Sequence, residues 1–546
     1  MDAELAYLFR HAVLRDAAYE LQLPSSRARL HELAFYLIEE TFGGRAPEPA
    51  SLTTFPPPAH QPHVLDSVAF ELSRHAKAAE AKLSAELVNL YLRRAAEYAS
   101  REHHNERALA LWLEIADLEN GAAHAQALRR AADHLSGSGR PHEAEPLLLR
   151  ALKIAQKDGP ALLEFGALND IAGVYWFTGR APEAVEICER NLMTARELGD
   201  RSLEASTIGH LAILNAGTGE IQRGMAGMRE ALAMQEEIGD ERGALMTLIN
   251  LSGLCRETSN MEDAERFCEQ ALALARKLEA RASEGMALAQ LSIVLSVTGR
   301  IKPAGEMIQQ ALQIFREIGD RRNVGKALVQ LAAVYQHTAR EELAISALED
   351  SLVAARETGD PYEEAFSLSN LAGVYGTAGR VAEAESMLRS ALALHRRLKS
   401  KRGEALTLDN LAGLCQDESR FPEAEEFFNE GLRLIREIGD RRHEGIAIGN
   451  HAAVYRKTGR HDLADAAYQE ALGIHREVGN QRFEGIHQCD YATLLVTDGR
   501  VEKAHTTWHA GAAILLELGD VKELERKIVI LNEVCFAAGI EPFEPS

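Results

Sequence analysis

The sequence predicts an all-α solenoid of antiparallel helix pairs, and three observations support this prediction. The dipeptide Gly-Asp recurs in a 40-residue register without insertion or deletion, at 199–200, 239–240, 319–320, 359–360, 439–440 and 519–520, with Gly-Asn at 479–480. Gly-Arg recurs half a period away, at 139–140, 179–180, 299–300, 379–380, 459–460 and 499–500. Between these dipeptides, apolar residues follow helical spacing. A strict period of roughly 20–50 residues is typical of a stack of identical supersecondary units.

The first segment, residues 1–43, contains a run of apolar and basic residues that ends in a second short basic motif. The run is Leu8-Phe9-Arg10-His11-Ala12-Val13-Leu14-Arg15-Asp16-Ala17-Ala18-Tyr19-Glu20, followed by Arg29-Leu30-His31. It resembles the segment that closes the ATPase module of bacterial STAND signalling ATPases, just before their repeats. Those proteins are often joined to nucleotide cyclases, kinases or LuxR-type regulators. The resemblance implies a sensor arm of bacterial signalling, and the alternative is a helical cap on the solenoid.

No ATPase motif accompanies this segment. The stretch from Gly319 to Gly325-Lys326 has one residue too many for a Walker A loop, and Ala327 occupies the Ser/Thr position. We therefore expect a sensor arm that lacks its own ATPase.

Two further segments precede the regular repeats. Residues 44–63 are predicted to be a linker rather than a packed element because prolines crowd them, at Pro47, Pro49, Pro56, Pro57, Pro58 and Pro62. Residues 64–120 are predicted to be degenerate helical repeats, with one helix pair over 84–118. Its two apolar stripes are Leu92, Ala95, Ala96 and Ala99, facing Ala108, Trp112, Ile115 and Ala116.

Residues 121–520 are predicted to be ten repeats of 40 residues, and 361–400 illustrate one of them. The first stripe has i, i+3, i+4, i+7 spacing and consists of Leu368, Leu371, Ala372 and Tyr375. The second consists of Ala384, Leu388, Ala391 and Leu392. We expect Gly379 to end the first helix in the left-handed conformation and Asp360 to cap the start of the repeat. Alanines at 372 and 384 should allow the two helices to approach closely.

This pattern, Leu-x-x-Leu-Ala-x-x-Tyr, then Gly, then Ala-x-x-x-Leu-x-x-Ala-Leu, resembles the tetratricopeptide repeat in the longer form that kinesin light chains approach. The resemblance implies a right-handed superhelix, and residues 521–546 are expected to be a capping helix and tail. Local departures are Asn215 for the Tyr, Gly224 for the Ala, and His451 and Tyr491 for the Leu. Burial of His451 should oppose its charging.

Composition excludes several classes of function. The formal net charge of −22 argues against a nucleic-acid or anionic-membrane surface. No apolar run approaches the ~20 residues of a membrane span, so we expect a cytoplasmic protein. Cys255, Cys415, Cys188 and Cys268 occupy apolar repeat positions, and the absence of a CxxC pair argues against zinc. No cofactor is expected.

The predicted binding site is a column of amides on the first helices. In tetratricopeptide proteins these helices line the concave face, and the residue before the recurrent Leu faces the groove. This position reads Asp170, His210, Asn250, Gln290, Gln330, Asn370, Asn410, Asn450 and Asp490. An amide both donates and accepts, so the six carboxamides, together with Arg456 and Lys457, are predicted to bind an extended peptide. The alternative is that the amides bond neighbouring helices and fix the angle between repeats.

Catalysis is not expected. The sequence has no His-Glu-x-x-His, no Gly-x-Ser-x-Gly and no glycine-rich phosphate loop. We expect a scaffold that binds a protein or extended peptide, with neither nucleic acid nor membrane as partner. The alternatives are a small-ligand sensor that regulates a separate ATPase or cyclase, and a truncated product of a larger signalling ATPase.

Overall fold

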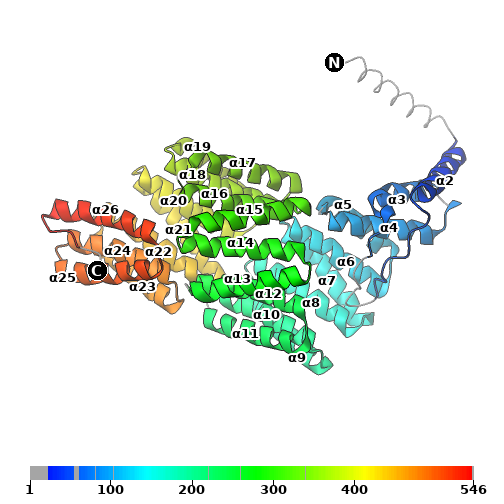
Figure 1. The fold of residues 1–546 in the computed structure, drawn as a ribbon, viewed down its shortest axis with the longest axis horizontal. Helices are drawn as coiled ribbons and strands as arrows, with labels where there is room; N and C mark the ends of the chain where they lie inside the picture. The colour runs from blue at the N-terminus through cyan, green and yellow to red at the C-terminus, as the bar shows by residue number, and fades with distance from the viewer. Residues whose placement is uncertain are drawn as a thin grey trace, which may run out of the picture. The chain divides into compact units, whose positions relative to one another are not determined.

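The computed structural model describes residues 23–543 apart from 54–60, 80, 81, 103, 219, 259 and 339. The described residues form α-helices joined by short turns, with one 3-10 helix and no strand among them (Figure 1). The chain divides into two compact units, Met1–Asp170 and Ile171–Ser546. The all-α fold predicted from the period is therefore confirmed.

The first described helix of the first unit is α2, and this unit carries the predicted degenerate pair. Its elements are α2 (Pro24–Thr41), η1 (Val64–Val68), α3 (Ala69–Ala78), α4 (Ala85–Arg101), α5 (Asn105–Leu118), α6 (Gly121–Gly137) and α7 (Pro141–Asp158). The two alanine-rich stripes predicted over 84–118 lie on α4 and α5 and are buried in one cluster around Trp112. The run Leu8–Glu20, on which the resemblance to signalling ATPases depends, lies outside the described residues.

The proline-rich segment packs against α4 over its described first part, which the sequence did not predict. Ala46 and Leu52 are buried. Arg94 of α4 donates from Nε to the Pro47 carbonyl at 3.0 Å and from Nη1 to Asp66 at 2.6 Å. The segment is held against α4 because the buried Arg94 donates both to a carbonyl of the segment and to the Asp66 carboxylate of η1. The prolines predict that this segment forms no helix. They cannot show that its Pro47 carbonyl accepts a hydrogen bond from Arg94, which lies 47 residues later in the sequence.

The second unit consists of regular helix pairs, one pair to each period. Helix α8 (Ala161–Phe177) spans the boundary between the units. The helices that follow are α9 (Ala181–Leu198), α10 (Arg201–Gly217), α11 (Ile221–Ile238), α12 (Glu241–Glu257), α13 (Met261–Lys277), α14 (Arg281–Val297), α15 (Ile301–Glu317), α16 (Arg321–His337), α17 (Glu341–Thr358), α18 (Pro361–Thr377), α19 (Val381–Arg397), α20 (Lys401–Asp417), α21 (Phe421–Ile438), α22 (Arg441–Lys457), α23 (His461–Glu477), α24 (Gln481–Thr497), α25 (Val501–Glu517) and α26 (Val521–Ala538). The even-numbered helices from α8 to α24 are the first helices of the repeats.

The predicted turn chemistry is present. Gly379 has φ +74° just after α18, the left-handed conformation that glycine adopts without strain. The Asp360 carboxylate accepts hydrogen bonds from the backbone N–H groups of Tyr362 and Glu363 at 3.0 and 3.2 Å. Ala372 and Ala384 are fully buried where α18 crosses α19. In this repeat, glycine therefore ends the first helix, aspartate caps its start and alanines allow the two helices to approach, whereas Glu279, Lys399 and Ser419 adopt the left-handed conformation at other turns.

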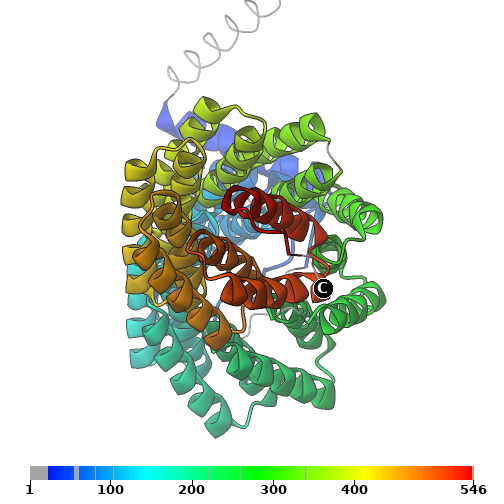
Figure 2. The ribbon, with the colours of Figure 1, turned by 90° about the vertical axis from the view of Figure 1, so that its left-hand side faces the viewer.

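The first helices form the inner side of the solenoid. Successive first helices lie against each other, as α12 does against α14 and α16 against α18. Figure 2 shows the repeats of this unit coiling around a common axis. We call the solvent-facing surface of α12, α14, α16, α18, α20 and α22 the inner face.

Coiling also brings distant repeats of this unit into contact. Arg442, at the start of α22, donates to the backbone carbonyl of Glu257, at the end of α12, over 3.2 Å and a separation of 185 residues. A Cβ added at Gly179 would lie 3.1 Å from Cγ2 of Ile438. Helices far apart in the sequence therefore meet end to end.

No helix in the described ranges is long and apolar enough to cross a membrane.

Candidate functional site

The six predicted carboxamides occupy one register position on six successive first helices. We call them the amide column: Asn250, Gln290, Gln330, Asn370, Asn410 and Asn450. Five are half-buried and Asn410 is exposed. The structure thus places all six on the inner face, as the repeat register requires.

Two members of the amide column already have protein partners. Asn370 donates to the carbonyl of Phe366 in its own helix at 2.8 Å. Asn450 donates from Nδ2 to Asp409 Oδ2 at 3.2 Å, and its Oδ1 lies 3.4 Å from His487 Nε2. Both ends of the Asn450 amide are therefore engaged by neighbouring repeats, the contact expected of an amide that fixes adjacent helices.

The other four amides lack such partners. Asn250, Gln290 and Asn410 make no hydrogen bond to the part of the chain that the structure describes, and Gln330 Oε1 is buried without a partner. The positions that contact Asn450 lie 41 residues before and 37 residues after it. For Asn250 these positions hold Gly209 and Ala287, which carry no polar side chain. Four amides on the inner face therefore remain available to a ligand.

An apolar column runs beside the amide column, one helical turn earlier. We define the apolar column as Met246, Met286, Phe366, Leu406 and Ile446, each four residues before an amide. Met246, Phe366 and Leu406 expose 43%, 44% and 36% of their surface. Exposed large apolar side chains that follow one another in register along one face form the kind of surface that a partner can cover. Sequence analysis did not single out this column, although its period of 40 residues is visible in the sequence.

The register position of the amide column holds aspartate in two other repeats, Asp170 in the first unit and Asp490 in the second. Asp170 pairs with Arg129, whose Nε lies 2.7 Å from Oδ2. Both carboxylate oxygens of Asp490 accept from the buried Lys527 Nζ at 2.6 Å. Although burial opposes the charge, Lys527 holds the pKa of Asp490 below its usual range. Asp170 and Asp490 are thus each held in an ion pair within the protein.

A chain of hydrogen bonds leads from α23 and α24 to Asp409 on α20. We call it the Asp409 relay. Asn480 Nδ2 lies 3.4 Å from His475 Nδ1, and His475 Nε2 lies 2.9 Å from His487 Nδ1. His487 then contacts Asn450, which donates to Asp409.

One set of tautomers satisfies the Asp409 relay. The ionised Asp409 carboxylate can only accept, so the amide nitrogen of Asn450 faces it and Asn450 Oδ1 faces His487. His487 must then carry its proton on Nε2 and accept on Nδ1, and His475 must likewise carry its proton on Nε2. Every donor consequently points toward Asp409.

Burial keeps both histidines of the relay neutral. It lowers the pKa of His475 to about 3 and that of His487 to about 4. Glycines of α22 make room for the two rings, because a Cβ at Gly449 would overlap the imidazole of His487 and a Cβ at Gly445 would lie 2.9 Å from His475 Cε1. The relay therefore depends on glycines that a helix interior would otherwise disfavour.

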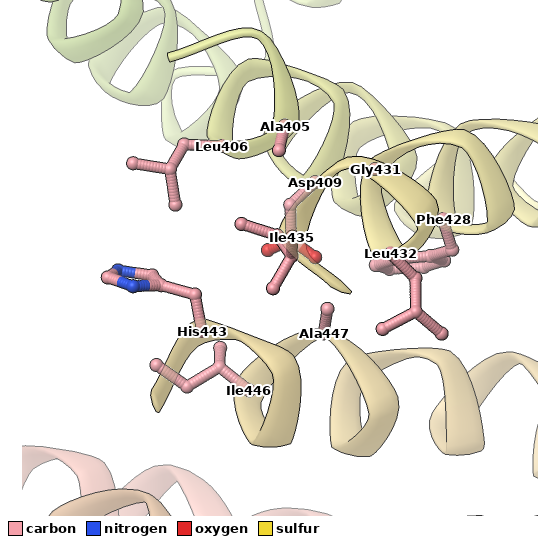
Figure 3. Close-up of a pocket in the computed structure, with 10 residues that line it drawn as sticks. All are labelled: Ala405, Leu406, Asp409, Phe428, Gly431, Leu432, Ile435, His443, Ile446 and Ala447. Atoms are coloured by element: carbon pink, nitrogen blue, oxygen red, sulfur yellow. The ribbon is translucent and has the colours of Figure 1, made fainter. Parts of the chain in front are cut away.

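Asp409 also lines a small cavity among α20, α21 and α22 (Figure 3). The cavity has a volume of about 30 Å³ and is lined by Ala405, Leu406, Asp409, Phe428, Gly431, Leu432, Ile435, His443, Ile446 and Ala447. Figure 3 shows the Asp409 carboxylate beside Ile435, with Leu406 of α20 and Ile446 of α22 projecting from the two flanking helices. Asp409 Oδ1 is buried and has no hydrogen-bond partner. Burial raises the pKa of Asp409 to about 6.

The predicted cations lie at the ends of first helices. Arg456 is half-buried, with no hydrogen-bond partner for Nε, and Lys457 is exposed beside it at the end of α22. Surrounding protein lowers the pKa of Lys457, because it removes water from the charged form. Lys457 and Arg456 thus lie at the far end of α22 from Arg442.

Arg442 is a functional candidate that sequence analysis missed. In other repeats the arginine at this position pairs with the aspartate that starts the next repeat, as Arg482 does with Asp520 at 2.7 Å. The next repeat after Arg442 starts instead with Asn480, and Arg442 reaches Glu257 of the distant α12. The asparagine in the Gly-Asn dipeptide was the signal in the sequence.

Comparison with known proteins identifies the repeats. One tetratricopeptide repeat model matches residues 243–317, 323–397 and 363–437, and a second matches 447–477. No curated protein matches the sequence.

Two solved structures are similar in part. A Rap protein complexed with competence and sporulation factor matches with 17% identity and a TM-score of 0.41, over 62% of this chain and 99% of that one. BtubC (BKLC) from P. vanneervenii matches with 19% identity and a TM-score of 0.33, over 40% of this chain and 90% of that one. Both family models that match describe tetratricopeptide repeats, and neither is an enzyme family. Residues 243–317, 323–437 and 447–477 are tetratricopeptide repeats.

Proposed function

We propose that this protein is a non-catalytic scaffold that binds an extended peptide segment of a partner protein along the inner face from α12 to α22. The observation that carries the proposal is the pairing of two columns. At Asn250, Gln290 and Asn410 an unpartnered amide lies one helical turn from an apolar side chain of the apolar column.

The chemistry of the two columns suits an extended chain. Amide side chains can pair with backbone N–H and C=O groups whatever the peptide sequence, whereas apolar side chains cover alternate residues of the peptide. Because the first helices are held by their own second helices, such a face is rigid before binding. A rigid face reduces the entropy lost on association.

The alternative of a small-ligand sensor is less well supported. The cavity at Asp409 has about 30 Å³, whereas pockets for drug-sized ligands and nucleotides have roughly 300–1,000 Å³. A larger hollow of about 480 Å³ has the right volume, but all its lining residues lie on the single helix α21, so it is an open surface and does not enclose a ligand. The resemblance of residues 1–43 favours a sensor or adaptor arm in bacterial signalling or transcriptional regulation. A truncated product of a larger signalling ATPase would have the same binding face.

The test compares three variants in capture from native cell extract. The triple variant Asn250→Ala, Gln290→Ala, Asn410→Ala removes three unpartnered amides, and we expect it to lose at least about 90% of a captured partner while melting within a few degrees of wild type. Asn450→Ala should instead lower the melting temperature, because it leaves Asp409 and His487 without a shared partner. Arg433→Ala, on the second helix α21, is the matched outer-surface control. A folded triple variant that retains the partner would rule out the inner face as the site.

A further inference from the structure

The cavity beside Asp409 has the size of a very small organic group. A site needs roughly 10–15 Å³ for each water-sized group, so a volume of about 30 Å³ accommodates two such groups in line. The lining is apolar except for Asp409 and His443. Gly431 opens the space, since the neighbouring repeats carry Ala391 and Ala471 at this position.

The Asp409 carboxylate brings an unmatched negative charge to this cavity. Its Oδ2 accepts from Asn450, whereas Oδ1 is buried without any donor. His443, which also lines the cavity, donates no hydrogen bond to Oδ1, and its Nδ1 lies 2.9 Å from Oδ2 of Asp440. A buried acceptor without a donor destabilises the fold. The Asp409 relay donates to one oxygen and leaves the other facing the cavity.

We propose that this cavity binds a primary ammonium group, –CH2–NH3+, carried by the bound partner, with Asp409 Oδ1 as its acceptor. The cavity has room for the methylene and the ammonium, the carboxylate supplies the opposite charge, and the apolar walls hold the methylene. This inference rests on the proposed peptide-binding function, because Leu406 and Ile446 belong both to the cavity lining and to the apolar column. A partner segment bound along the inner face would therefore lie next to the cavity.

Other groups fit less well. A guanidinium has four heavy atoms and a quaternary ammonium has five, so both exceed a space for two. An anion would meet the Asp409 carboxylate, and a water molecule would leave the charge uncompensated. Two sources of this group remain, the amino terminus of a peptide that begins with glycine and a lysine side chain.

The experiment uses the full chain and small amines, so that it does not depend on an identified partner. Thermal unfolding is followed with increasing methylammonium chloride at pH 7.5, against tetramethylammonium chloride at the same concentrations. We expect a saturable rise of the wild-type midpoint with methylammonium alone, because a ligand that binds the folded state stabilises it. Two variants serve as controls. Asp409→Asn removes the charge, and Gly431→Ala places a methyl group in the cavity, 3.3 Å from the nearest atom, the Ala405 carbonyl oxygen.

The expected result is that neither variant responds to methylammonium. At pH 5 the affinity of wild type should be about tenfold lower, since about a tenth of Asp409 remains ionised one pH unit below its pKa of about 6. Glycinamide and n-butylammonium then represent the two sources, an amino terminus and a lysine side chain. The one with the larger saturable shift identifies the source.

Two outcomes would overturn the proposal: no saturable shift in wild type, or an equal shift in Asp409→Asn. Neither would bear on the proposed peptide-binding function, whose test removes Asn250, Gln290 and Asn410 and leaves Asp409 in place. Conversely, if the folded triple variant retains the partner while wild type still binds methylammonium through Asp409, only the peptide-binding proposal fails.

Discussion

His451 shows how one residue makes the stability of a repeat depend on pH. It occupies a position where most repeats carry leucine, and it is buried between the rings of Phe428 and Tyr455, with centroids 5.3 and 4.3 Å away. Its Nε2 has no hydrogen-bond partner. Burial lowers the pKa of His451 to about 4. The imidazole is therefore an uncharged member of an apolar stack at neutral pH.

Replacing His451 with leucine should reduce the acid sensitivity of the protein. The unfolded chain binds a proton at His451 below a pKa of 6.5, whereas the folded chain does so only below about 4. Wild type therefore loses stability as the pH falls from 6.5 toward 4, by up to about 3 kcal/mol. His451→Leu should show a shallower fall in the free energy of urea unfolding between pH 7 and pH 4.5. Identical pH profiles for the two proteins would contradict the assignment.

The amide column shows how far single residues can be interpreted from sequence. The period predicts that all six amides share one face, because a register position repeats with the helix pair. It does not predict which amides are free, since that depends on side chains in the two adjacent repeats. Asn450 meets Asp409 and His487 there, whereas Asn250 meets Gly209 and Ala287. Asp409 itself escaped notice because a single aspartate on a helix has no motif.

At the scale of an element, α22 is shaped by the histidines that pack on it. Gly445 and Gly449 lie in its interior, where glycine costs about 1 kcal/mol relative to alanine. Each faces a buried imidazole of the Asp409 relay, His475 or His487. Only glycine at positions 445 and 449 leaves space for the two rings, so packing the histidines between the helices requires the lower helix propensity of glycine.

The variant Gly449→Ala tests this coupling. A Cβ at this position would overlap the His487 ring, so we expect a loss of about 2–3 kcal/mol in wild type. In a His487→Ala background the same change should be neutral or stabilising by up to about 1 kcal/mol. Gly413→Ala is the matched control, because a Cβ there meets nothing within 4 Å. Urea unfolding of the four combinations measures the coupling, and an equal cost in both backgrounds would show that the ring is not the cause.

At the scale of the second unit, the sequence predicts neighbours well and distant contacts poorly. The 40-residue period specifies that each repeat packs on the next. Which repeats meet after a turn depends on a small rotation accumulated over several helix pairs, and no local pattern records that rotation. The contact of Arg442 with Glu257, across 185 residues, is of this kind. The sequence carries only an indirect sign of it, the asparagine at 480.

Replacing Asn480 with aspartate should release that contact. The change also removes the Nδ2 donor to His475 Nδ1, a hydrogen bond that the variant Arg442→Ala leaves in place. In Asn480→Asp the new carboxylate should hold Arg442 within its own pair of repeats, as Asp440 holds Arg402 at 3.4 Å and Asp520 holds Arg482 at 2.7 Å. The carbonyl of Glu257 would then lose its donor from α22. We expect faster hydrogen exchange at the end of α12, by about three- to tenfold, as for the loss of about 1 kcal/mol.

The same acceleration should appear in Arg442→Ala. It should be absent in Arg402→Ala, because Arg402 pairs with Asp440 of the next repeat and does not bond α12. Exchange within α18, far from the contact in sequence, provides an internal reference for global unfolding. Unchanged protection of α12 in both Asn480→Asp and Arg442→Ala would mean that packing alone, including Ile438 against Gly179, joins the two turns.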